Sequence, residues 1–224
     1  MPEEINRIVT DHVSNLLFAP TPTAMTNLGM EGLIKVSKLT GDVMFDSVLY
    51  YKDKILKNPG QYAITGLPDD YLLATVHRAE NTDNIENLKN LFKAFSESGR
   101  NIVLPIHPRT KKIIKGVIHL PENVHLIDPV GYLQMLYLTM HAEKVLTDSG
   151  GLQKEAYFLG KQCITLRTET EWIETLHDRW NIISGTDPGK ILDAIKSEAP
   201  SASQADSFGN GKAAELIVGL LKGK

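Results

Sequence analysis

KVLTDSGGLQKEAYF, residues 144–158, reads as a buried strand, a short polar turn and a helix in direct succession. The apolar run Lys144–Leu146 ends at a turn that contains two glycines, and a helical stretch follows from Gly151 to Phe158. A short buried strand that passes into a helix is typical of a βαβ unit, whose strands are parallel. This stretch therefore predicts a parallel sheet with helices packed against it.

The same alternation extends through most of the chain. Short buried strands that alternate with helices predict an α/β fold, a Rossmann-like parallel sheet with flanking helices. The other apolar runs are Leu72–Val76, Ile102–Ile106, Val124–Ile127 and Ile164–Leu166, and the helical stretches between them are Ile85–Ser96, Lys111–Val117 and Tyr132–His141. The apolar pair Ile182-Ile183 and helices at about 188–197 and 211–221 complete the chain.

The first 41 residues do not follow this pattern. Pro2 and the two acids after it predict a helix start, and Leu16–Ala19 is a short apolar strand closed by Pro20. One or two helices and one short strand are too little for an independent core, so we expect them to be the remnant of a preceding Rossmann-like domain. The predicted organisation is this remnant at 1–41, a nucleotide-binding domain at 42–200, and a linker with a terminal helix at 201–224.

Composition and charge exclude several classes of protein. The chain has 224 residues, of which 42% are hydrophobic and 23% charged, which is ordinary for a globular protein. The net charge of −3 gives no basic excess, so we expect neither a nucleic acid nor a membrane as partner. Cys163 is the one cysteine, which fits a reducing, cytoplasmic location and a small buried hydrophobic side chain.

Ser149, Gly150 and Gly151 lie where the strand of the opening stretch ends and its helix begins. Glycines let the backbone approach a ligand closely, and the first N–H groups of a helix point at an anion. The serine hydroxyl adds a donor, so this turn predicts a pyrophosphate site. Glu155 is placed to hold ribose hydroxyls, or only to complement the helix dipole. A glycine-rich turn without a ligand is the alternative interpretation.

Polar clusters follow other predicted strands as well. His77 and Arg78 follow one strand, and His107 follows the next. Ligands bind such sheets at the carboxyl ends of the strands, where a histidine can transfer a proton and an arginine can hold a phosphate. Ordinary turn chemistry is the alternative. Neither histidine has neighbouring carboxylates at ligand spacing, so no metal site is predicted.

An ordered set of motifs resembles the non-hydrolysing UDP-N-acetylglucosamine 2-epimerase family over essentially the whole chain. The motifs are PEEINR (2–7), TGDVMFDS (40–47), VHRAEN (76–81), PIHP (105–108), TDSGGLQKEA (147–156), RTETEW (167–172) and FGNGKA (208–213). The resemblance implies the C-terminal half of a GT-B-like two-domain fold, with an amino-terminal half missing here. It also implies that the terminal helix packs back toward the first domain.

The resemblance further implies a reaction. Family members interconvert UDP-N-acetylglucosamine and UDP-N-acetylmannosamine, for surface polysaccharide precursors, by eliminating UDP and adding it back. Such chemistry needs placed carboxylates, a closed cleft and a stabilised pyrophosphate leaving group, and it requires no cofactor or metal. By position, Glu3 and His77 match catalytic residues, and the substrate-binding matches are Arg7, Arg78, His107, Ser149, Gly150, Gly151 and Glu155.

Some positions depart from the family pattern. Two essential carboxylates of the family's first domain have no counterpart, so we expect this polypeptide to be inactive alone. Met135 replaces an aromatic residue beside the uracil, and Trp172-Ile173 replaces an Arg-Pro pair, which suggests a different sugar such as a diacetamido-uronate. A hydrolysing 2-epimerase and a non-catalytic UDP-binding module are the alternatives, and we expect a homodimer.

Overall fold

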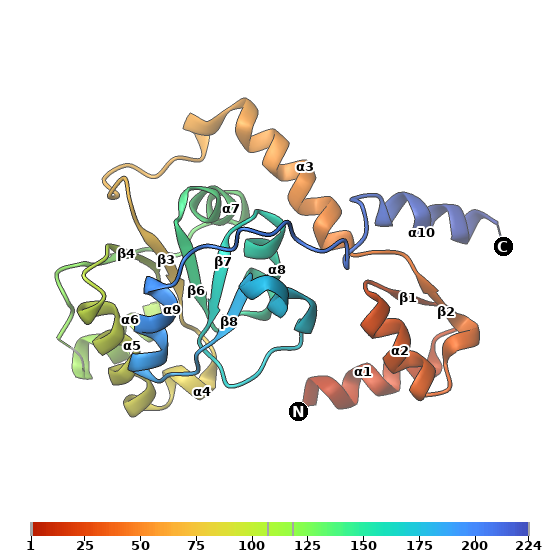
Figure 1. Ribbon diagram of the computed structural model, residues 1–224, viewed down its shortest axis with the longest axis horizontal. Helices are drawn as coiled ribbons and strands as arrows, with labels where there is room; N and C mark the ends of the chain where they lie inside the picture. Colours follow the sequence, from red (N-terminus) through yellow and green to blue (C-terminus); the bar gives the residue numbers. More distant parts are fainter. Residues whose placement is uncertain (1, 107, 118, 224) are drawn as a thin grey trace. The chain divides into compact units, whose positions relative to one another are not determined.

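Six parallel strands form one sheet in the larger of two structural units (Figure 1). The computed structural model describes residues 2–106, 108–117 and 119–223, without the side chains of residues 2, 3, 108, 109, 115 and 117. The sheet unit is Tyr51–Ala205, and the terminal unit combines Met1–Tyr50 with Asp206–Lys224. The domain boundaries expected from the sequence, after residues 41 and 200, stay a prediction.

The strands of the sheet unit lie in the order β5-β4-β3-β6-β7-β8, and neighbouring strands are parallel. The chain moves outward from β3 in one direction and from β6 in the other, so the topological switch point lies between these two strands. The predicted Rossmann-like parallel sheet is confirmed. The strands are β3 (Leu72–Thr75), β4 (Ile102–Pro105), β5 (Val124–Ile127), β6 (Lys144–Thr147), β7 (Gln162–Thr165) and β8 (Asn181–Ile183).

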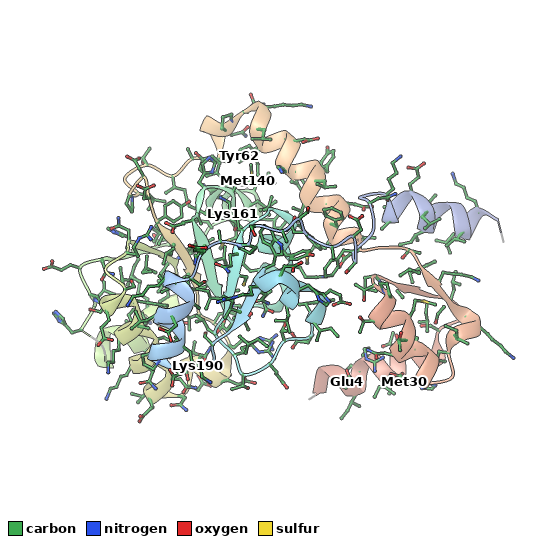
Figure 2. All side chains as sticks on the ribbon, in the orientation of Figure 1. Glu4, Met30, Tyr62, Met140, Lys161 and Lys190 are labelled. Carbon is green, nitrogen blue, oxygen red and sulfur yellow. The ribbon has the colours of Figure 1, made fainter. Side chains whose placement is uncertain are left out.

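Helices cover both faces of the sheet because side chains alternate between the two faces along each strand. Leu72 and Ala74 of β3 belong to the core formed with α5, α6 and α9, whereas Leu73 belongs to the core formed with α7 and α8. Side chains fill the space between the strands and the helices that cover them (Figure 2). The helices are α4 (Ala79–Thr82), α5 (Ile85–Glu97), α6 (Pro108–Val117), α7 (Tyr132–His141), α8 (Gly150–Phe158) and α9 (Pro188–Lys196), with 3-10 helices η2 (Pro59–Gln61) and η3 (Ile173–Arg179). Within the described residues, no helix has the length and apolar character needed to cross a membrane.

The edge strand β8 was indicated in the sequence only by an apolar pair. Its Ile183 pairs with Thr165 of β7, and the Thr165 hydroxyl donates a 2.7 Å hydrogen bond to the side chain of Asn181. Three residues are too few to show the alternation that identifies a strand, so only the sheet itself defines β8. Cys163 of β7 is buried as expected, and burial raises the pKa of its thiol to about 12.

The terminal unit contains a two-stranded parallel sheet, β1 (Leu17–Ala19) with β2 (Ser37–Leu39). The strand β2 was not predicted, because its Ser-Lys-Leu sequence carries no apolar run. A small core of Leu17, Ala19 and Leu28 lies under this sheet. The helices of the unit are α1 (Pro2–Val13), α2 (Pro22–Met30), the 3-10 helix η1 (Ile34–Val36) and α10 (Ala213–Lys222), and α3 (Val43–Lys57) begins in it.

The two ends of the terminal unit meet at a pair of glycines. Gly41 and Gly209 have φ angles of 83° and 86°, a region that favours glycine. A Cβ on Gly41 would lie 3.0 Å from the Phe208 carbonyl oxygen, and one on Gly209 would lie 3.0 Å from Gly41 Cα. Beside this contact, the Asp46 carboxylate accepts hydrogen bonds from the first amides of α10, at 3.1 Å from Ala213 and 2.7 Å from the next residue.

Asp46→Ala is expected to loosen the first turn of α10, because these amides would lose their acceptor. A lost helix cap costs about 1 kcal/mol, so the Ala213 amide should exchange its hydrogen roughly fivefold faster. Hydrogen exchange followed by NMR measures this rate. Asp53→Ala, at an exposed position farther along α3, is the control. Unchanged exchange in Asp46→Ala would show that α10 is held by other contacts.

Candidate functional site

Polar clusters follow β3, β6 and β7, which are neighbours in the sheet. Because the strands are parallel, the clusters share one edge, with the switch point at its middle. A cavity of ≈ 240 Å³ opens there. It is lined by Thr75, His77, Met135, Ser149, Gly151, Leu152 and Glu155. The structure thus brings together His77 and the predicted phosphate-binding turn.

The turn between β6 and α8 has the local geometry expected of an anion site. Ser149 is the N-cap of α8, and its hydroxyl accepts a 3.4 Å hydrogen bond from the Leu152 amide. Its own amide donates to the Thr147 hydroxyl at 2.9 Å. The amides of the first helical turn have no acceptor within the helix, and the positive end of the helix dipole lies at the same place. A phosphate group would accept hydrogen bonds from these amides and would interact favourably with the helix dipole.

Asp148, between Thr147 and Ser149, is fully buried and binds the turn at the end of β3. Its Oδ2 accepts hydrogen bonds from the amides of His77 and Arg78, at 3.1 and 3.0 Å, and from Asn81 Nδ2 at 3.0 Å. The Nδ1 atom of the His77 ring lies 3.2 Å from Oδ1 of the same carboxylate. One side chain of the β6 turn therefore organises the turn that follows β3.

Glu155 is buried on α8, one and a half turns from the helix start. Burial raises the pKa of this carboxyl to about 7, although Lys154 and a hydrogen bond from the Tyr132 hydroxyl act in the opposite direction. A carboxyl with this pKa changes its charge near neutral pH. The site therefore contains a titratable acceptor beside the predicted phosphate-binding turn.

The cluster after β7 lies over the start of α8. Arg167 is buried and its Nη1 donates to both carboxylate oxygens of Glu171, at 2.9 and 3.0 Å. Burial acts to raise the pKa of Glu171, but its own backbone N–H, Arg167 and Arg78 outweigh burial and lower that pKa. Lys154 Nζ lies 3.9 Å above the ring of Trp172. This cluster, the RTETEW motif at 167–172, lies against Gly150 at the start of α8.

Among the predicted site residues of the sheet unit, Arg78 and Gly150 adjoin lining residues in the chain but do not themselves line the cavity. Arg7, in the terminal unit, donates 2.7 Å hydrogen bonds to Glu4, Asp11 and Glu31, and these carboxylates raise the pKa of its guanidinium. The side chain of Glu3 and the whole of His107 lie outside the described residues. Their functional roles stay predictions.

The sequence patterns did not point to Asp148, although it stands in the motif that carried the anion site. An acid directly after a buried strand is the signal that was present. Tyr132 was also not anticipated, because its hydrogen bond to Glu155 joins two different helices, α7 and α8. In the part of the chain that the structure describes, no group of three or more His, Cys, Asp or Glu is arranged to hold a metal ion.

The doubly wound parallel sheet, with a helix start and a buried acid at its switch point, defines an α/β protein of the Rossmann-like class. The sequence profile described as UDP-N-acetylglucosamine 2-epimerase matches residues 1–222. The chain therefore belongs to the UDP-N-acetylglucosamine 2-epimerase family, as the motifs predicted.

Individual relatives agree with this assignment. A UDP-N-acetylglucosamine 2-epimerase homolog of Methanococcus maripaludis is 48% identical over 232 residues, a match that covers 99% of this chain and 64% of the relative. The UDP-2,3-diacetamido-2,3-dideoxy-D-glucuronate 2-epimerase of Pseudomonas aeruginosa is 42% identical over 229 residues, covering 99% and 63%. The crystal structure of Methanocaldococcus jannaschii UDP-GlcNAc 2-epimerase in complex with UDP-GlcNAc and UDP matches with a TM-score of 0.88 and 39% identity, covering 100% of this chain and 65% of that one. The chain thus spans a little under two thirds of the length of these relatives.

Proposed function

We propose that the cavity at the switch point binds the UDP part of a UDP-sugar, and that the chain contributes this site to a UDP-N-acetylglucosamine 2-epimerase. The observation that carries this proposal is the position of His77, Ser149, Gly151 and Glu155 around one cavity. The start of α8 suits the pyrophosphate, and Glu155 suits the ribose hydroxyls. Met135, which lines the same cavity, supplies an apolar contact for the uracil ring.

In the proposed reaction, the C2 proton leaves the sugar while UDP departs from C1, and both return with protonation on the opposite face. Leaving-group departure puts negative charge on the pyrophosphate, which the amides of α8 and His77 are placed to stabilise. Glu3 is the proposed acid–base carboxylate, and Arg7, Arg78 and His107 are proposed substrate contacts. No cofactor or metal enters this scheme, and the homodimer and the cytoplasmic location stay predictions.

A second candidate substrate is UDP-2,3-diacetamido-2,3-dideoxy-D-glucuronate. The Pseudomonas relative named for this sugar is 42% identical to the chain, close to the identity of relatives named for UDP-N-acetylglucosamine. The departures at Met135 and Trp172 also favour a changed sugar. Hydrolytic release of UDP and binding without turnover are the other outcomes that an assay must separate.

UDP is expected to bind the purified chain weakly, because the described contacts come from one wall of a cleft. Titration calorimetry with millimolar UDP measures the affinity, and uridine is the control that lacks the phosphates. The chain is further expected to turn over neither UDP-sugar by itself, because transition-state stabilisation needs groups from both walls. No heat with UDP, or equal heat with uridine, would contradict the proposed site.

A further inference from the structure

The contact between Asp148 and the His77 ring is more than the fold requires. The backbone amides of His77 and Arg78 and the side chain of Asn81 already satisfy the buried carboxylate: all three donate to Oδ2, and the His77 amide is shared with Oδ1. Such partners are what a buried carboxylate needs to be tolerated. The His77 side chain is 54% exposed, so water is available to its ring nitrogens, yet its Nδ1 lies against the carboxylate.

We propose that Asp148 is a positioning residue for His77, which accepts the Nδ1 proton of the ring and leaves Nε2 for the ligand in the cavity. The neutral imidazole carries one proton, and the nitrogen that holds it is set by the partner of that nitrogen. A buried carboxylate fixes the tautomer and orientation of the histidine in serine hydrolases by the same principle. The ring of His77 therefore presents one chosen nitrogen.

This arrangement assigns a separate task to each ring nitrogen. Nε2 has a lone pair in the neutral ring and gains a proton when the ring is protonated, while the proton on Nδ1 stays directed at Asp148. The protonated Nε2 then donates to an anionic oxygen of the ligand. The tautomer itself is independent of the proposed function, whereas the task of Nε2 rests on UDP being the ligand.

The test is the tautomer of His77, read from the ¹⁵N resonances of its ring in labelled protein and assigned with His77→Gln. In the unmodified protein we expect the protonated nitrogen of the neutral ring to be Nδ1. In Asp148→Asn, the backbone donors should keep the asparagine oxygen at the position of Oδ2. The NH₂ group then faces the ring and donates to Nδ1, so the proton of the neutral ring should move to Nε2. A proton on Nε2 in the unmodified protein, or an unchanged tautomer in the variant, would overturn the proposal.

Asn81→Ala is the matched control, because it removes another partner of Asp148 and leaves the carboxylate beside His77. The His77 tautomer in this variant should equal that in the unmodified protein. If Asp148→Asn does not fold, the tautomer measured in the unmodified protein still tests the proposal.

In Asp148→Asn, UDP affinity should fall roughly tenfold, the value of one charge-assisted hydrogen bond. A tautomer switch in a chain that does not bind UDP would refute the proposed function alone. UDP binding with no tautomer switch would refute the positioning role alone.

Discussion

Gly150→Val is expected to abolish UDP binding while the sheet unit stays folded. Gly150 is the first residue of α8, where a phosphate must approach the backbone to reach the amides. A Cβ there would meet Glu171 Oε2 and Trp172 Nε1, both at 3.4 Å, so the protein tolerates the first added atom with a small shift. The added methyl groups then occupy the space in front of the amides.

The expected loss is roughly 100-fold or more, since two charge-assisted hydrogen bonds are worth about 1.5–3 kcal/mol each. Titration calorimetry with UDP gives the affinity, and circular dichroism reports the fold. Gly116→Val in α6, where an added Cβ meets nothing within 4 Å, is the control for placing valine in a helix. Undiminished UDP binding in Gly150→Val would show that the pyrophosphate does not bind at the start of α8.

Glu155→Gln is expected to stabilise the sheet unit above neutral pH and to change it little in acid. Burial raises the pKa of Glu155 from 4.5 to about 7 in the folded protein. Between these values the folded state keeps a proton that the unfolded chain has lost, so the free energy of unfolding falls as pH rises. Below about pH 4.5 both states are protonated, and above pH 7 both are ionised and the full penalty of the buried charge remains.

Glutamine carries no charge and removes this dependence. The advantage of Glu155→Gln over the unmodified protein should therefore grow by at most about 3 kcal/mol between about pH 4 and pH 8, at about 1.4 kcal/mol per pKa unit. Urea unfolding followed by tryptophan fluorescence measures it, because both tryptophans, Trp172 and Trp180, lie in the sheet unit. Glu122→Gln, at an exposed position, is the control. A constant difference across this pH range would show that Glu155 ionises normally.

Local sequence patterns are sufficient to predict the layered fold and the edge of the sheet that carries the candidate site. Buried strands such as Leu72–Thr75 and Ile102–Pro105 consist mostly of apolar residues, and helices of recognisable period separate them. These are local signals, because they depend on the pattern within one element. The polar turns after the strands are equally local, and parallel pairing brings them to a common edge.

The interactions among these polar residues depend on how distant segments pack against each other. The contact of Asp148 with His77 joins residues 71 positions apart, and no pattern within either turn specifies it. The same holds for β2 and β8, short strands that exist because a neighbour offers a ladder of hydrogen bonds. The raised pKa of Glu155 is also a tertiary property, since it arises from burial by several elements. Residue type determines which chemistry is possible at each position. The packing of distant segments determines which of these groups are buried and which groups they interact with.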